Sequence, residues 1–265
     1  MKDIKKAALS EKVLNTVYFI LPFLSLSLLF LGWVAISNAR PDLFPTPGRV
    51  YERFIMLFQR PVRGLNLFGH VWASLKRVLY ALSAATVIGV SFGLAIGWNR
   101  TARAVFGTIF DFFRPIPPLA WIPLITIWFG IGEFPKVLIV FIGCFVPLVI
   151  NTDIGIRMID SLYLDVGRIF QANKRQLFIE IALPSALPTI FAGFRTATGG
   201  GWLCVLAAEM LGAREGLGFL IIRGMESGDM ALIFVAMLFI GFTGAMLAYL
   251  TFYLERWVCP WNPTR

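Results

Sequence analysis

Residues 165–184 read DVGRIFQANKRQLFIEIALP. This polar segment interrupts a chain in which 58% of residues are hydrophobic, only 15% are charged and the mean hydropathy is +0.76. A soluble domain usually has about 25% charged and 45–50% apolar residues. The composition therefore predicts several membrane spans, with this segment held in water between two of them.

Six apolar stretches are candidate spans, since a bilayer requires about 20 mostly apolar residues. They lie at 16–37, 78–98, 106–130, 137–150, 187–211 and 230–254. The third stretch contains RPIPPLAWIP, and such proline breaks are tolerated at membrane depth only where protein or a water-filled cavity covers the freed backbone. We therefore expect the third span to be broken and to lie inside a helical bundle.

The spans divide the chain into three predicted parts. A basic N-terminus and a first span, expected to be retained because no small-residue cleavage site follows it, occupy 1–37. An extracytoplasmic loop at 38–77 carries VYERFIMLF, which has the pattern of a short amphipathic helix at the membrane interface. Five further spans form the core at 78–265, and residues 212–229 are expected to form a loop before the last of them.

Lysine and arginine counts predict the orientation. The side that holds both termini carries 12 of these residues and the opposite loops carry 8, and cytoplasmic loops hold the excess in membrane proteins. Both termini and residues 151–182 are therefore expected in the cytoplasm. The same bias accounts for the net charge of +9 without nucleic acid as a partner.

Charged and apolar side chains alternate through residues 151–182 in a pattern typical of two short amphipathic helices. On pattern alone, an ordinary solvated loop is the alternative. Long ordered connections tend to be functional, and a helix that projects into a groove on a partner is a known recognition mode. We expect a helical hairpin that binds another protein.

The hairpin resembles a motif of the integral-membrane subunits of ATP-binding-cassette (ABC) importers. That motif is Glu-Ala-Ala, three residues, Gly, nine residues, Ile, one residue and Leu-Pro, and here its frame begins at Asp165-Val166-Gly167. Asp165 replaces Glu, Val166-Gly167 replaces Ala-Ala, and Gln171 replaces the glycine at the bend between the two helices. The resemblance implies coupling to an ATPase through Asp165, Gly167, Arg168, Gln171, Lys174, Arg175, Ile181, Leu183 and Pro184.

Four other stretches resemble the permeases for taurine, alkanesulfonates, nitrate and bicarbonate, with the taurine branch closest. They are SLKRVLYALSAATVIGVSFGLAIG, RPIPPLAWIPLITIWFGIGE, LPSALPTIFAGFRTATGGGWLCVLAAEM and GLGFLI. The resemblance runs from about residue 43 to the C-terminus. It implies an all-α integral membrane protein, a six-span helical bundle of the type I ABC importer permease (MetI-like) kind, with a cytoplasmic coupling-helix hairpin at about 151–182.

The resemblance also implies a bacterial inner-membrane location and a set of partners. These are two ATP-binding-cassette ATPase subunits, a second permease chain in a homodimer, a periplasmic or lipid-anchored substrate-binding protein, and a small anion as substrate. No stretch reads G-x-x-x-x-G-K-[ST], the loop that cradles nucleotide phosphates. ATP and Mg²⁺ are therefore expected on the partner ATPase, and no cofactor, metal or catalytic residue on this chain.

Ionisable groups within spans usually face the interior or a cavity. Arg114, beside the proline break, is expected either to bind an anion or to extend its side chain to the lipid headgroups. Arg195 is expected to pair with Asp111 or with lipid phosphate. Glu209 is either an outer gate or half of a structural ion pair. The glycines at 199–201 permit close helix approach or bending. The candidate pathway or gate residues are Arg114, Trp121, Thr196, Thr198, Trp202 and Glu209.

Two other classes of protein are weighed against an ATP-driven importer subunit. A secondary transporter predicts internal repeats and acidic residues near mid-membrane, yet no repeat is evident and Glu209 is the lone candidate acid. A membrane enzyme predicts clustered His, Asp or Ser at span ends, and the chain has one histidine, His70. The importer subunit is favoured, with a secondary transporter or channel that works without an ATPase as the alternative.

Overall fold

The computed structural model describes the backbone of residues 2–261 and the side chains of residues 17–261. The basic side chains expected before residue 17 and at Arg265 lie outside these described residues. The described elements are helices, in the order α1 (Lys2–Ala39), α2 (Pro47–Gln59), α3 (Leu67–Trp98), α4 (Arg100–Ala102), η1 (Arg103–Gly107), α5 (Thr108–Phe113), η2 (Pro118–Trp121), α6 (Ile122–Phe129), α7 (Glu133–Arg157), α8 (Ser161–Ile169), α9 (Lys174–Gln176), η3 (Leu177–Ala182), α10 (Leu183–Met210), α11 (Leu217–Ser227) and α12 (Met230–Val258). The predicted all-α fold is confirmed.

Five helices are long and apolar enough to cross a membrane. They are Val17–Ala39, Leu67–Trp98, Glu133–Arg157, Lys174–Met210 and Met230–Val258. A sixth crossing comes from Arg100–Phe113 followed by Pro118–Phe129, two helical pieces bent by 84° at the proline break. The six spans and the break in the third agree with the prediction from hydropathy.

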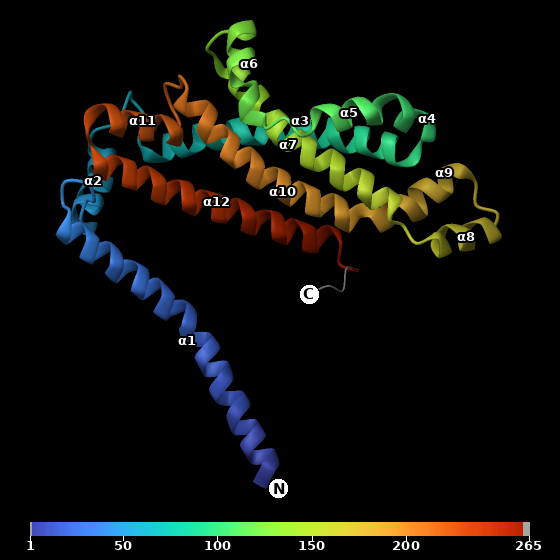
Figure 1. The fold of residues 1–265 in the computed structure, drawn as a ribbon, viewed down its shortest axis with the longest axis horizontal. Helices are drawn as coiled ribbons and strands as arrows, with labels where there is room; N and C mark the ends of the chain where they lie inside the picture. The colour runs from blue at the N-terminus through green and yellow to red at the C-terminus, as the bar shows by residue number, and fades with distance from the viewer. Residues whose placement is uncertain (1, 262–265) are drawn as a thin grey trace.

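The long helices α3, α7, α10 and α12 run side by side (Figure 1), and α7 packs between α3 and α10. Helices α2 and α11 lie at one end of this bundle, which we call the α11 end. Helices α8 and α9 project from the opposite end, the α8 end, toward which α12 also runs. Helix α1 meets the bundle at the α11 end and then diverges from it (Figure 1).

Glycines allow the central helices to approach closely. A Cβ atom on Gly93 of α3 would lie 2.6 Å from the Cβ of Thr152 on α7, and one on Gly201 of α10 would lie 2.5 Å from Sγ of Cys144. Gly199, by contrast, has no atom within 4 Å of an added Cβ. The expected role of the glycine run in close packing therefore holds for Gly201, whereas Gly199 faces open space.

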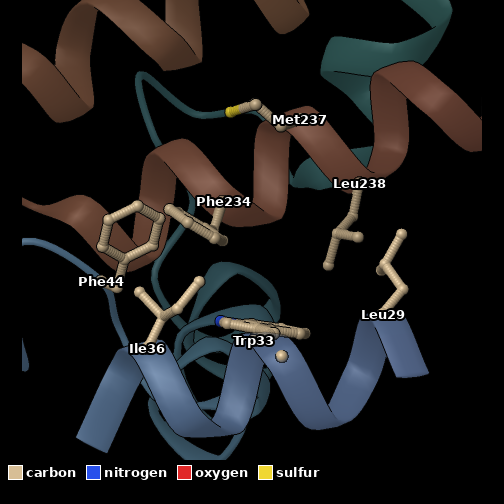
Figure 2. A pocket seen from close by; sticks show the side chains of 8 residues that line it. Leu29, Trp33, Ile36, Phe44, Phe234, Met237 and Leu238 are labelled. Carbon is tan, nitrogen blue, oxygen red and sulfur yellow. The ribbon is translucent and has the colours of Figure 1, made fainter. Parts of the chain in front are cut away.

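Helix α1 contacts the bundle through aromatic side chains near its C-terminal end. Trp33 stacks on Phe234 of α12 with ring centroids 5.8 Å apart, and its Nε1 donates to the carbonyl of Pro45 at 3.0 Å. Beside this contact lies an apolar cavity of about 490 Å³ between α1 and α12 (Figure 2). Its lining includes Leu29, Trp33, Ile36, Phe44, Phe234, Met237 and Leu238. The apolar side chains of α1 before this contact are exposed, as expected of a helix that faces lipid.

Three boundaries differ from those predicted. Helix α3 begins at Leu67, because Asn66 caps it by accepting from the Gly69 amide at 2.8 Å. Residues 212–229 were expected to form a loop, and this expectation is wrong: α11 lies there, between Gly216 and Gly228, whose φ angles are +118° and +68°. The second arm of the expected hairpin runs without interruption from α9 through η3 into α10.

Candidate functional site

The hairpin at the α8 end is built from two capped helices. Asp160 caps α8 by accepting from the Leu162 amide at 2.9 Å. Asn173 and Gln176 form a reciprocal capping box at the start of α9, which satisfies amides that would otherwise lack partners. The expected pair of short helices is thus present, and local polar residues determine where each helix begins.

The turn between the arms places Gln171 at φ +58°, in the left-handed region. Its amide donates to the Arg168 carbonyl at 2.9 Å, and the Ala172 amide donates to the Gly167 carbonyl at 3.0 Å. A glycine adopts this conformation without steric cost. The bend therefore forms with glutamine at the motif's glycine position.

The two arms cross at Gly167. A Cβ atom on this residue would lie 2.5 Å from Cδ1 of Ile181 and 2.7 Å from Cδ2 of Leu177, both on η3. Ile181, a motif residue, therefore packs against Gly167, a position at which the motif has the small residue alanine. Leu183 and Pro184 follow at the start of α10, which continues η3 without a break: the Leu183 amide donates to the Phe178 carbonyl, and the proline that follows has no amide to donate.

The tip of the hairpin exposes apolar and basic side chains. Phe170 is 80% exposed and Ile169 77%, Lys174 and Arg175 are exposed, and Arg168 pairs with Asp165 at 2.7 Å. A groove of about 410 Å³ runs along the hairpin, lined by Leu162, Tyr163, Val166, Glu180, Ile181, Pro184 and Ser185. An exposed apolar patch rimmed by charge is typical of a protein-binding surface.

A second cluster lies at the α11 end, around the buried guanidinium of Arg77 on α3. Its Nη1 donates to Oε1 of Glu209 at 2.7 Å, and its Nε and Nη2 donate to both carboxylate oxygens of Glu133 at 2.6 and 2.9 Å. Nη1 also donates to the carbonyl of Glu215 at 3.1 Å. The side chain of Arg77 is 3% exposed and that of Glu209 is fully buried. The cluster joins α3, α7, α10 and the segment before α11.

The same cluster holds the N-terminus of α11. The amide of Gly216 donates to Nδ1 of His70 at 3.1 Å, that of Leu217 to Oγ of Ser74 at 2.9 Å, and that of Gly218 to Oε2 of Glu209 at 2.9 Å. Helix N-termini leave amides without intrahelical partners and favour a nearby carboxylate. Of the two interpretations of Glu209, the structure shows the ion pair.

His70, Ser74 and Arg77 were not predicted as site residues, because they fall in the segment assigned to the outer loop. Their spacing of four and three residues was the available signal, since it places all three on one helix face. No local pattern in the sequence identifies the partners described above, which lie 56 to 146 positions away.

Further ion pairs join the broken span to α7 and α10 to α12. Arg103 of η1 donates to Asp153 of α7 at 2.7 Å, and Asp111 lies 3.4 Å from Arg114. Arg195 pairs with Glu255 of α12 at 3.2 Å. The expected pairing of Arg195 with Asp111 is therefore wrong; α12 supplies its partner.

The predicted pathway residues are not gathered in one place. Arg114 is half exposed beside the bend of the broken span, whereas Glu209 is buried at the α11 end. Trp202 is buried and donates from Nε1 to the carbonyl of Ile240 on α12 at 3.2 Å. Among the described contacts, the hydroxyls of Thr196 and Thr198 make no hydrogen bond outside α10. Each donates to a backbone carbonyl of that helix.

Trp121 is partly buried beside Phe113, with ring centroids 6.3 Å apart. It lies in η2, immediately after the bend of the broken span. On α10, Thr196, Gly199, Leu203 and Met210 form an exposed stripe. Within residues 17–261, no three His, Cys, Asp or Glu side chains are placed to hold a metal ion.

A bundle of membrane spans, one of them broken, with a motif-bearing hairpin at one end defines an integral-membrane component of a transporter. Comparison with known proteins identifies which kind. The chain belongs to the family of binding-protein-dependent transport system inner membrane components, which matches residues 85–261.

Three curated relatives cover most of the chain. The taurine transport system permease protein TauC of Escherichia coli is 31% identical and covers 90% of this chain and 88% of its own length. The nitrate import permease protein NrtB of Synechocystis is 32% identical, with 90% and 89% covered. A putative ABC transporter permease protein of Methanocaldococcus jannaschii is 32% identical, with 97% of both chains covered.

Among solved structures, the fold is similar to that of a chain of the MetNI methionine ABC transporter in an inward-facing conformation. The TM-score is 0.63 at 19% sequence identity, and the match covers 72% of this chain and 95% of the other. This similarity shows that the two chains share a fold.

Proposed function

We propose that this chain is the permease subunit of an ATP-driven ABC importer that carries a small anion across the inner membrane. The single observation that carries the proposal is the α8–η3 hairpin, whose crossing at Gly167 and Ile181 and turn at Gln171 fit the coupling motif. The relatives named for taurine, nitrate and bicarbonate support a small substrate that carries an anionic group: taurine or another sulfonate, nitrate, or bicarbonate. ATP and Mg²⁺ belong to separate ATPase subunits.

In this proposal the α8 end faces the cytoplasm, both termini lie on that side, and the hairpin inserts into an ATPase. Two copies of the chain enclose the pathway, two ATPases bind below, and a substrate-binding protein docks at the α11 end. The exposed stripe of α10 that contains Thr196 and Gly199 supports this arrangement, because no helix within residues 17–261 covers it. Arg114 and Trp121 contribute from the broken span.

Reconstitution tests the proposal. The chain is co-expressed with a candidate partner ATPase, purified and placed in proteoliposomes, and uptake of labelled taurine, nitrate and bicarbonate is measured with a candidate substrate-binding protein. ATP-dependent uptake that requires both chains is expected. Uptake by this chain alone, without ATPase or ATP, would instead establish the secondary transporter or channel.

A further inference from the structure

A carboxylate near the α8 end joins two separate parts of the chain. Asp153 of α7 has a side chain that is 9% exposed, and its Oδ2 accepts from Nη1 of Arg103 at 2.7 Å. The same Oδ2 lies 2.9 Å from Nη2 of Arg157. Two guanidinium groups from different elements therefore share one carboxylate oxygen.

The two arginines belong to the broken span and to the base of the hairpin. Arg103 is the first residue of η1, a π-helical segment in the first half of the broken span. Arg157 is the last residue of α7, and Asp160, which caps α8, follows three positions later. Asp153 thus bridges the segment before the 84° bend and the connection that supports the hairpin.

The charges continue from Arg103 toward the bend itself. Asp111 of α5 lies 4.0 Å from Nη2 of Arg103 and 3.4 Å from Nη1 of Arg114. Arg114 directly precedes Pro115, where the helix stops. A continuous row of alternating charges, Arg157, Asp153, Arg103, Asp111 and Arg114, therefore connects the base of the hairpin to the proline break.

The helices around Asp153 are closely packed, whereas η1, which begins at its partner Arg103, is not regular α-helix. Added Cβ atoms on Gly93 and Gly97 would lie 2.6 and 3.1 Å from Thr152 and Ile156, so α3 and α7 are in close contact on both sides of Asp153. Both η1 and η3 are π-helical. Such segments are rare and occur frequently at functional sites.

We propose that Asp153 is a positioning residue that couples the hairpin to the broken span through Arg103 and Arg157. When the hairpin shifts, the end of α7 transmits the shift to Asp153, and the Arg103 contact transmits it to the segment before the bend. Partial burial makes the charge pair effective, because buried pairs are screened less than exposed ones. The inference rests on the proposed function, since the hairpin moves only if an ATPase drives it.

The test measures the ratio of anion uptake to ATP hydrolysed in proteoliposomes that contain the complete complex. Asp153→Asn keeps the side chain's size and removes its charge. Arg103→Gln removes the charged partner of Asp153; Arg103 is less buried than Asp153 and is therefore easier to substitute. Each variant is expected to lower the ratio about tenfold. The double variant is expected to lower it no further, because both changes break the same contact. Tyr249→Phe, which removes an exposed hydrogen bond to Tyr253 within α12, is the control and should leave the ratio unchanged.

The outcomes separate the two proposals. If the wild-type complex shows no ATP-dependent uptake, the proposed function fails. If the wild type is coupled but both single variants keep a ratio within about twofold of it, the role of Asp153 is overturned. A parallel fall in uptake and hydrolysis, with an unchanged ratio, also overturns it, because that result is expected of a purely structural residue. Additive effects in the double variant would show that Arg103 and Asp153 act separately.

Discussion

Arg77 on α3 and Glu209 on α10 form a buried ion pair in which Nη1 lies 2.7 Å from Oε1, although 132 positions separate the residues in sequence. Glu209 also accepts from the first turn of α11, so the ends of three helices depend on one carboxylate. The α11 end is thereby fixed. The two π-helical segments lie at the opposite end, and a bundle held at one end and adaptable at the other suits a transporter that alternates between conformations.

Glu209→Gln is expected to lower the thermal stability of the purified chain in detergent. The substitution leaves Arg77 buried with only the partly exposed Glu133 and Glu215 as anionic partners. Loss of one partner of a buried pair typically costs about 3–5 kcal/mol, and the remaining carboxylates reduce that cost. Glu226→Gln, at an exposed pair, should change the free energy of unfolding by less than about 1 kcal/mol. Equal melting temperatures for the two variants would refute the importance of the buried pair.

Ser74→Ala tests the anchoring of α11. It removes the acceptor of the Leu217 amide and a donor to Glu209, and a buried polar group left without a partner costs about 1–3 kcal/mol. Hydrogen exchange at the amides of Gly216 and Leu217 should accelerate. Ser227→Ala is the control, because that hydroxyl donates only within α11. Unchanged exchange in Ser74→Ala would show that other contacts hold the helix.

The cluster around Arg77 also shows why the sequence predicted the spans better than their ends. Hydropathy identified every crossing, because apolar runs of sufficient length have few alternatives in a bilayer. Hydropathy did not detect the first turns of α3, because the polar residues His70, Ser74 and Arg77 in these turns are typical of a loop. The partners of these residues come close only in the tertiary structure, so a local sequence pattern cannot predict them.

Gly93→Ala is expected to destabilise the α3–α7 contact. Its new Cβ would lie 2.6 Å from the Thr152 Cβ and 2.9 Å from the Val149 carbonyl oxygen, so a backbone must move. Overpacking of this kind costs about 1–3 kcal/mol. Gly241→Ala in α12 is the matched control: nothing lies within 4 Å, and alanine favours the helix by about 1 kcal/mol. Thermal unfolding in detergent should therefore separate the two variants in opposite directions.

Lys174→Glu combined with Arg175→Glu should abolish transport without loss of membrane insertion. Both cations are exposed on the hairpin beside the turn, and reversal of exposed charges disturbs a partner surface more than the fold that carries it. Uptake and ATPase co-purification are the measurements. Arg214→Glu combined with Arg223→Glu, at the α11 end, is the control for net charge and should leave the ATPase bound. Normal uptake by the hairpin variant would contradict the coupling role.

The hairpin itself could be predicted because its signal is local. Capping residues such as Asp160 and Asn173, and the Leu-Pro that begins α10, lie within the segment they organise. The contact of Asp153 with Arg103 could not be predicted, because α7 and η1 meet only after the broken span folds back. For the same reason the partner of Arg195 was assigned wrongly.

Gln171 provides the most local test of the hairpin, since its φ of +58° is the feature on which the turn depends. Gln171→Gly removes a left-handed strain of about 1–2 kcal/mol but adds about 0.5–1 kcal/mol of backbone entropy, so the turn should gain up to about 1.5 kcal/mol. Gln171→Val should do the reverse, because a β-branched side chain is a genuine outlier at positive φ. The valine variant must then shift its backbone and lose the amide bonds from Gln171 to Arg168 and from Ala172 to Gly167. Hydrogen exchange at residues 166–177 is expected to slow in the glycine variant and accelerate in the valine variant, with weaker ATPase binding in the latter. Faster exchange in the glycine variant would mean that the glutamine side chain, and not the backbone conformation, stabilises the bend.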